Sequence, residues 1–257
     1  MSIHATAIVA DSAVIADDAE IGPYTIIGDD VEIGSGTRVE GHVVINGPSR
    51  IGKNNHIYQF SSVGDDPQDK KYRDEPTRLD IGDGNTIREY CTISRGTIQD
   101  ESLTSIGDDN WIMAYVHIAH DCRVGSHCIF ANNATLAGHV HVGDHAIFAG
   151  FTGAHQFCRI GAHAFMGMYA GTSRDVPAYT MVGGQPPGAK GINSEGLKRR
   201  GFTADQIRNI KNAYRVVYRK GLKLAEAIAE LESVAAGQPE LDLFIDSLKT
   251  SERGIIR

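Results

Sequence analysis

The chain has 257 residues, 41% of them hydrophobic, and a net charge of −7, which argues against a nucleic-acid partner. No stretch approaches the roughly 20 apolar residues of a membrane-spanning helix. The first residues, MSIHATAIVADS, lack the basic and then apolar pattern of a secretory leader. We therefore expect a cytoplasmic protein that neither spans a membrane nor binds nucleic acid.

Aliphatic residues recur at six-residue intervals through most of the chain. The interval holds from Ile3 to Val63, from Ile81 to Ile93 and, after a one-residue shift of phase, from Ile106 to Thr172. A short period repeated this often indicates one structural unit stacked many times, and six matches neither a helix nor simple strand alternation. Three hexads would close a triangular coil, so that positions 18 apart lie above one another at about the 4.8 Å spacing of neighbouring strands.

Two polar segments interrupt the six-residue pattern. Residues 64–80 contain Pro67 and Pro76 and end with the pattern in its original phase, and residues 94–105 form the second interruption. Polar loops on a rigid scaffold are common places for binding residues. We expect both to be excursions from a solenoid domain of residues 1–190.

A helical domain is expected over residues 191–257. Thr203 and Gln206 have the spacing of a capping box, apolar residues predict a second helix over 224–235, and Pro239 lies near the start of a third. Such a domain would cover the open end of the solenoid. Eight basic and two acidic residues give residues 194–220 a charge of +6, which indicates either an anionic partner or a solvated helix face.

Eight of the eleven histidines lie between residues 117 and 163, all off the inward positions. His120, Gly138 and Gln156 are 18 residues apart and share one column, with His139 and His155 one step beside it. A row of imidazoles on one edge suits an extended polar ligand or a metal ion. It also suits proton transfer, because imidazole is the natural general base near neutral pH.

His120 is the best candidate for a general base, because Asp121 follows it and can orient the ring. Gly138 has no side chain to block a substrate, and its N–H could stabilise an oxyanion. A base and an adjacent amide donor suffice for acyl transfer from a thioester to an alcohol, since the hydroxyl attacks directly.

Longer motifs resemble those of a known family. They are QDKKY and EPTR in the first interruption, then HIAHDC, NNATLAGHV, HQF and NSEGLKRRGF. Essentially end to end, the chain resembles the cytoplasmic UDP-N-acetylglucosamine 3-O-acyltransferases that open lipid A biosynthesis. The resemblance implies an all-β left-handed parallel β-helix of hexapeptide repeats with a C-terminal α-helical cap, assembled as a homotrimer with active sites between subunits. The reaction it implies moves a 3-hydroxyacyl group from acyl carrier protein to the glucosamine 3-hydroxyl of UDP-N-acetylglucosamine, with no metal and no cofactor beyond the donor's phosphopantetheine.

The resemblance also assigns roles to residues at matching positions. His120 is the base, Asp121 its orienting partner and Gly138 the oxyanion donor. The residues that contact the nucleotide sugar are Gln68, Asp69, Lys71, His117, His139, His155 and Gln156. The residues that handle uridine, pyrophosphate and the pantetheine arm are Asn193, Glu195, Arg199 and Arg200. The basic segment would then dock the acidic carrier protein.

Two positions depart from the family pattern. Ser94 of TISRGT replaces a histidine found in many relatives, which we interpret as dispensable for the chemistry. Met168 stands where long-chain relatives have glycine, and its side chain would fill the end of an apolar groove. We therefore expect an acyl chain nearer ten carbons than fourteen, unless the flexible Met168 side chain swings aside.

Other readings of the sequence remain open. A zinc enzyme of the γ-carbonic anhydrase type uses a similar solenoid with interface histidines, but needs no EGLKRRG helix. A sugar N-acyltransferase and a plain binding scaffold are further alternatives, and no residue decides between a 3-hydroxyl and a 3-amino acceptor. The four cysteines lack zinc-site spacing and are expected to be buried free thiols.

Overall fold

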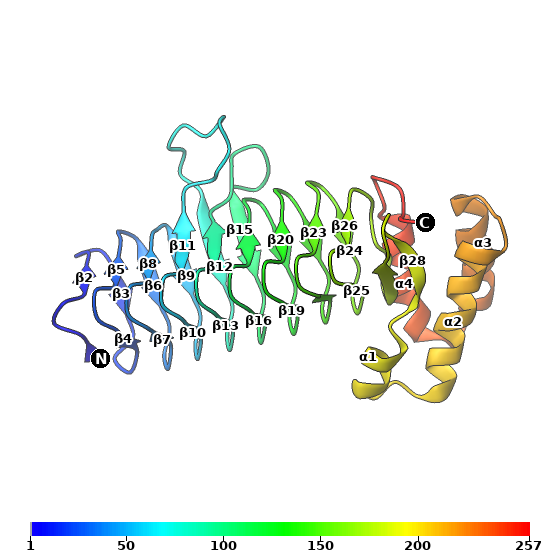
Figure 1. Ribbon diagram of the computed structural model, residues 1–257, viewed down its shortest axis with the longest axis horizontal. Helices are drawn as coiled ribbons and strands as arrows, with labels where there is room; N and C mark the ends of the chain where they lie inside the picture. Colours follow the sequence, from blue (N-terminus) through cyan, green and yellow to red (C-terminus); the bar gives the residue numbers. More distant parts are fainter. Residues whose placement is uncertain (1) are drawn as a thin grey trace.

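The computed structural model describes residues 2–257, which form a long three-sided prism with helices at one end (Figure 1). Parallel sheets, here called A, B and C, make the sides, and each coil adds one short strand to each sheet. The corners between them are called the A–B, B–C and C–A corners in chain order. The expected fold class, a left-handed parallel β-helix with a C-terminal helical cap, is confirmed.

The strands of each sheet stack in the order of the coils, and all pairs are parallel except β27 with β28. Sheet A contains β1 (Ser2–Ile3), β4 (Glu20–Ile21), β7 (Arg38–Val39), β10 (His56–Ile57), β13 (Thr86–Ile87), β16 (Trp111–Ile112), β19 (Ile129–Phe130), β22 (Ile147–Phe148), β25 (Phe165–Met166), β27 (Thr180–Gly183) and β28 (Gly188–Ile192). Sheet B contains β2 (Ile8–Val9), β5 (Ile26–Ile27), β8 (Val44–Ile45), β11 (Ser62–Asp65), β14 (Thr92–Ser94), β17 (His117–Ile118), β20 (Thr135–Leu136), β23 (Gly153–Ala154) and β26 (Gly171–Thr172). Sheet C contains β3 (Val14–Ile15), β6 (Val31–Ile33), β9 (Ser49–Ile51), β12 (Arg78–Ile81), β15 (Leu103–Ile106), β18 (Arg123–Val124), β21 (His141–Val142) and β24 (Arg159–Ile160).

The strand register follows the 18-residue rule wherever no excursion intervenes. Ile118 pairs with Leu136, for example, and Val124 with Val142. The excursions stretch one coil by 12 residues and another by seven. Because the second insertion is not a multiple of six, it produces the shift of phase seen in the sequence.

The prism interior holds the six-residue series and a second set of inward residues that the sequence reasoning missed. Residues two positions earlier also point inward, and many of them are small or polar: Ala19, Thr25, Thr37, Asn55, Asn85 and Asn110 are buried examples. All four cysteines occupy this second position and are buried free thiols, as expected. Burial raises the pKa of Cys122 to about 12, so these thiols are unreactive.

The first coil departs from the predicted burial. Ile3 is 37% exposed and Val9 and Ile15 are only partly buried, because no coil precedes them to cover that end. The other end is covered by the antiparallel pair β27 and β28, which the sequence did not indicate, and by the helices.

The cap contains α1 (Ser194–Arg199), α2 (Ala204–Arg219), α3 (Leu224–Val234), a 3₁₀ turn (Pro239–Leu241) and α4 (Asp242–Lys249). The capping box is confirmed, with Thr203 and Gln206 each bonding the other's backbone N–H. The last two predicted helices are also present, and α1 covers most of the EGLKRRG segment. The expected domain boundary at residues 190 and 191 falls within β28. No helix within residues 2–257 is long and apolar enough to cross a membrane.

Candidate active site

A cleft of about 550 Å³ lies at the B–C corner, beneath the excursions that project from the upper edge of the prism in Figure 1. The first excursion and the second project side by side from neighbouring coils, between β11 and β12 and between β14 and β15. The cleft is lined by Gln68, Asp69, Lys70, Lys71, Gln99, His120, His139, Gln156 and Phe157. Six of these residues were predicted as site residues; Lys70, Gln99 and Phe157 were not.

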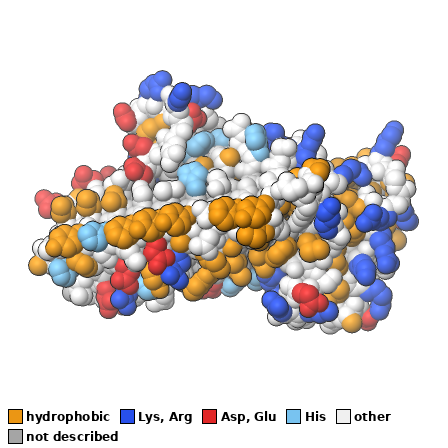
Figure 2. All heavy atoms as spheres, in the orientation of Figure 1, with side chains coloured by type: hydrophobic (Ala, Val, Ile, Leu, Met, Phe, Trp, Pro, Cys, Tyr) orange, Lys and Arg blue, Asp and Glu red, His pale blue; other side chains and the backbone are white. Residues whose placement is uncertain are grey.

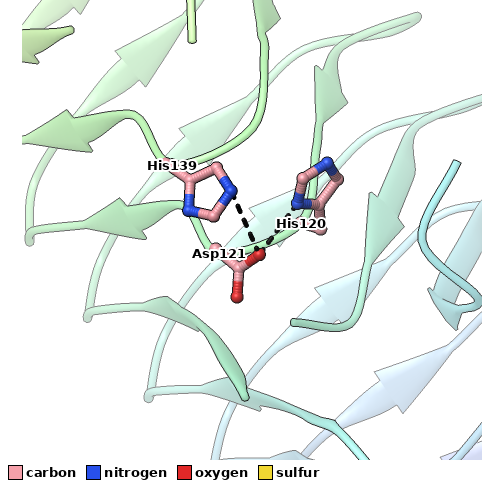
Figure 3. A group of neighbouring side chains, drawn as sticks. All are labelled: His120, Asp121 and His139. Carbon is pink, nitrogen blue, oxygen red and sulfur yellow. Dashed lines mark hydrogen bonds and ion pairs between the residues drawn. The ribbon is translucent and has the colours of Figure 1, made fainter. Parts of the chain in front are cut away.

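His120 and Asp121 form a hydrogen-bonded pair on the floor of this cleft (Figure 3). The Nδ1 atom of His120 lies 2.8 Å from Oδ2 of Asp121, a fully buried carboxylate. Thr97 donates to the same carboxylate from its backbone N–H (2.8 Å) and from its hydroxyl (2.6 Å). Burial alone would raise the pKa of Asp121, but the bonds from His120 and Thr97 outweigh it and hold the pKa below its usual value. Asp121 therefore stays ionised and fixes the imidazole.

His139 belongs to the next coil and lies between two carboxylates. Its Nε2 atom is 3.6 Å from Oδ2 of Asp121, and its Nδ1 atom is 3.4 Å from Oδ2 of Asp100. The ring meets that of His120 edge-on and stacks on Phe157 with a centroid distance of 4.4 Å. His139 is thereby held against the base from the coil above.

Gly138 lies directly against the ring of His120, as the 18-residue rule requires. A Cβ atom placed on Gly138 would lie 2.5 Å from Cε1 of His120, so only glycine leaves the ring where it is. Within residues 2–257 the Gly138 N–H makes no hydrogen bond, although the neighbouring His139 N–H donates to the His120 carbonyl. A free amide donor thus lies beside the candidate base.

The remaining predicted histidines lie at the margin of the site. His117 is on the outer face of sheet B and accepts or donates a 2.7 Å bond with the Thr92 hydroxyl. Burial, and then the nearby charge of His120, lowers the pKa of His117. His155 is an exposed corner residue one step from Gln156.

The predicted residues of α1 are not in this cleft. Asn193 caps α1 and donates to the His163 carbonyl, and Arg200 donates to the carbonyl of His145 at the C–A corner. Glu195 pairs with Lys198 in solvent, and Arg199 is exposed. Figure 1 places α1 at the edge of the prism opposite the excursions. A single chain therefore does not unite the two predicted halves of the site.

Met168 and Ser94 also lie outside the cleft. Met168 is 58% exposed at the A–B corner, across the outer face of sheet B from His120. Gly153 and Gly171 leave that face bare. Ser94 is buried at the end of β14.

His120, Asp121 and His139 are the one group of three potential metal ligands within residues 2–257. However, both oxygens of Asp121 already accept hydrogen bonds, from Thr97 and from His120. An ion would have to displace these donors from a buried carboxylate. The arrangement suits an imidazole base better than a metal centre.

The fold and this cleft define a transferase built from hexapeptide repeats. The bacterial transferase hexapeptide model matches residues 12–47 and 103–138, and the model described as UDP-N-acetylglucosamine O-acyltransferase, domain 2, matches residues 175–256. The acyl-[acyl-carrier-protein]–UDP-N-acetylglucosamine O-acyltransferase of Stutzerimonas stutzeri is 56% identical over 255 residues, 99% of each chain. The solved structure of the Moraxella catarrhalis UDP-N-acetylglucosamine O-acyltransferase is 49% identical with a TM-score of 0.99 over 100% of both chains, and that of LpxA from Acinetobacter baumannii is 51% identical with a TM-score of 0.97 over 99% of both.

The chain belongs to the acyl-[acyl-carrier-protein]–UDP-N-acetylglucosamine O-acyltransferase family and is an enzyme of this type.

Proposed function

We propose that the protein transfers an R-3-hydroxyacyl group from acyl carrier protein to the glucosamine 3-hydroxyl of UDP-N-acetylglucosamine, as a step of lipid A biosynthesis. The observation that carries this proposal is the placement of His120 between the buried carboxylate of Asp121 and the bare backbone of Gly138. The family relationship supports the two substrates, since the names of the relatives specify them.

The proposed chemistry begins with proton removal by His120. Because Nδ1 faces a carboxylate, it carries the proton, and Nε2 is left as the base for the sugar hydroxyl. The alkoxide attacks the thioester carbonyl, and the oxyanion of the tetrahedral intermediate is stabilised by the Gly138 N–H. Collapse breaks the carbon–sulfur bond, and the imidazolium returns its proton to the leaving thiolate. Asp121 stabilises the imidazolium throughout without itself accepting the proton. No cofactor besides the donor's phosphopantetheine takes part in this scheme.

The first excursion is proposed to hold the nucleotide sugar over the base. Gln68, Asp69 and Lys71 line the same cleft as His120. An ammonium group and an amide on the roof match the phosphates and the sugar hydroxyls. Gln156 and His139 would contact the sugar from below.

We propose that the active unit is a homotrimer in which α1 of one copy completes the cleft of another. The separation of Asn193 and Arg199 from His120 within one chain supports this arrangement. So does an aromatic stripe along the A–B corner, visible as a line of apolar side chains in Figure 2 and made of Tyr24, Phe60, Tyr90, Tyr115, Phe151 and Tyr169, each 45–60% exposed. A row of exposed rings on this scale is typical of a surface covered in an assembly. Light scattering at a mass of three chains is the expected result.

The basic surface of α1 and α2 is proposed to dock acyl carrier protein. This surface comprises Arg199 of α1 and, on α2, Arg208, Lys211, Arg215 and Arg219. Complementary charge would speed encounter with an acidic carrier and make the rate fall with added salt.

The acyl chain is proposed to run from the cleft along the bare face of sheet B toward Met168. Each methylene excluded from an apolar groove forfeits about 0.8 kcal/mol, so Met168 favours a donor of about ten carbons. Competition between 3-hydroxydecanoyl and 3-hydroxymyristoyl carrier protein tests this length. Faster turnover of the longer donor would refute it.

An acyl-transfer assay with the wild type and His120→Ala tests the central proposal. We expect transfer to fall about 10³-fold, while UDP-N-acetylglucosamine still binds with affinity within a few-fold of wild type. His127→Ala at the C–A corner is the matched control and should retain wild-type turnover. Equal turnover of His120→Ala and wild type would contradict the assignment. A parallel assay with the 3-amino analogue decides between the two acceptors.

A further inference from the structure

The second excursion makes contacts that the proposed chemistry has not used. Residues 95–100 run between β14 and β15, and three of their side chains, those of Arg95, Thr97 and Asp100, contact residues of the site. None of the three is assigned a role by the mechanism above.

Arg95 bonds to the first excursion on both sides of the segment that lines the cleft. It is only 8% exposed, and one terminal nitrogen, Nη2, donates both to the carboxylate of Asp66 and to the hydroxyl of Tyr72, 3.1 Å away. The other, Nη1, donates to the carbonyls of Gly47 and Gly64 at 2.8 Å. Asp66 and Tyr72 are the residues that flank the segment carrying Gln68, Asp69 and Lys71. One guanidinium therefore ties that segment to the wall of the prism.

Thr97 fixes the partner of the base. Its N–H and hydroxyl bond the two different oxygens of Asp121, and the hydroxyl shares Oδ2 with His120. Thr97 is 1% exposed, so water does not replace these bonds. Without them a buried carboxylate would lose two of its donors, and its orientation toward the imidazole would no longer be set.

Asp100 holds the second imidazole. Its Oδ2 atom faces His139 at 3.4 Å, and its Oδ1 atom is anchored by Arg123 at 3.2 Å. The adjacent Glu101 pairs with the same arginine but contacts neither histidine within the residues described.

We propose that residues 95–100 are the positioning segment of the active site. Arg95 sets the loop that binds the nucleotide sugar, and Thr97 and Asp100 set the two imidazoles through carboxylates. The inference rests on the proposed role of His120. It predicts that neighbouring residues of one short segment control different kinetic constants, because Arg95 acts on the loop that binds the nucleotide sugar whereas Thr97 and Asp100 act on the imidazoles.

The first test separates substrate binding from chemistry. Arg95→Lys keeps the charge but cannot make the forked contacts, so KM for UDP-N-acetylglucosamine should rise about tenfold with kcat within about threefold. Thr97→Val is nearly isosteric and should lower kcat about 30-fold with little change in KM. Thr97→Ser retains the hydroxyl and should restore kcat to within about threefold of wild type.

The second test uses a matched pair of acids. Asp100→Asn should lower kcat about tenfold with KM within about threefold, because the carboxylate that holds His139 beside the base is lost. Glu101→Gln removes the same charge one residue away and should leave both kcat and KM as in the wild type.

Two results would overturn the proposal. The first is a kcat of Thr97→Ser that is as low as that of Thr97→Val. The second is that Arg95→Lys and Thr97→Val change the same kinetic constant, each in proportion to its loss of thermal stability. Either would mean that the segment supports only the fold. These outcomes differ from failure of the proposed reaction itself, which would show as absence of wild-type transfer or as full activity of His120→Ala.

Discussion

Histidines with the same backbone conformation lie at two corners of the prism, but only one of these corners forms a candidate active site. His139 at the B–C corner and His145 and His163 at the C–A corner all have a left-handed φ of 58–62°. At the B–C corner the imidazoles face the carboxylates of Asp121 and Asp100 beneath two excursions. At the C–A corner the rings of His145 and His163 stack 4.7 Å apart, and Arg200 of the cap lies 3.5 Å from Nδ1 of His163 and donates to the His145 carbonyl.

The contrast shows that position in the repeat sets where an imidazole lies but not what it does. At the B–C corner this backbone conformation places His139 between two carboxylates, beside His120 and in the open cleft. At the C–A corner it gives a structural stack in which neighbouring rings and an arginine cover the imidazole. At the C–A corner, burial, then His145 and Arg200, lowers the pKa of His163 to about 4, which keeps it neutral.

The largest expected difference between the corners comes from matched Asp→Asn substitutions. Asp121 and Asp109 both occupy left-handed corner positions beside a histidine, but Asp121 is buried and Asp109 is 3.7 Å from His127 in solvent. Asp121→Asn should lower kcat about 10³-fold or more, because an amide can donate to Nδ1 and favour the wrong tautomer. Asp109→Asn should leave kcat unchanged, since exposed pairs contribute about 0–1 kcal/mol. Steady-state kinetics of both variants check this, and similar losses would remove the distinction between the corners.

Gly138→Ala should lower kcat by displacing the His120 ring at the B–C corner, without changing any charge. The new Cβ would lie 2.5 Å from the ring of His120, which must move away from its place beside Asp121. A displacement of about 1 Å at a reacting group can cost about 10²-fold in rate, so kcat should fall by that order while UDP-N-acetylglucosamine affinity changes little. Gly183→Ala, at a position where a Cβ atom would meet only the Lys190 side chain at 3.9 Å, serves as a fold control. Wild-type kcat in Gly138→Ala would exclude the stacking of these residues as a catalytic requirement.

The sequence was sufficient to predict the coil, the excursions and the column of His120 and Gly138, because a six-residue period fixes vertical neighbours. It was insufficient for the second inward position, where Thr37, Asn55 and Cys91 share no residue type. Thr97 and Asp100 were also missed, since a polar excursion has no period that says which side chain returns to the site. The antiparallel pair β27 and β28 lies where the period ends, and the pattern gave no register there.

His163 at the C–A corner should make the free energy of unfolding depend on pH. The pKa of His163 falls from 6.5 to about 4 on folding, so between these values the unfolded chain binds the proton and the folded chain does not. Stability is therefore complete above pH 6.5 and is lost as the pH falls, by about 2 kcal/mol between pH 7 and pH 5. His163→Phe keeps a ring in the stack and removes the proton, so its unfolding free energy should vary less over this range. Denaturant titrations at both pH values measure the difference, and an equal loss in the variant would assign it to other groups.

The smallest and most selective effect is expected at the A–B corner, on the preference for donor chain length. Met168 is exposed at the A–B corner, its Cε atom would lie 4.0 Å from a Cβ on Gly150, and we propose that its side chain marks the end of the path of the acyl chain. Met168→Gly should raise kcat/KM for the 14-carbon donor relative to the 10-carbon donor about tenfold, because methylenes excluded by the thioether gain about 0.8 kcal/mol each when they enter the groove. Turnover of a saturating 10-carbon donor should change little, since His120 and Gly138 are untouched. Tyr169→Ala removes a neighbouring exposed side chain of the same corner and should not shift the length preference. If both variants shifted the length preference equally, the limit on chain length would be set by the whole aromatic stripe, and Met168 would have no specific role in it.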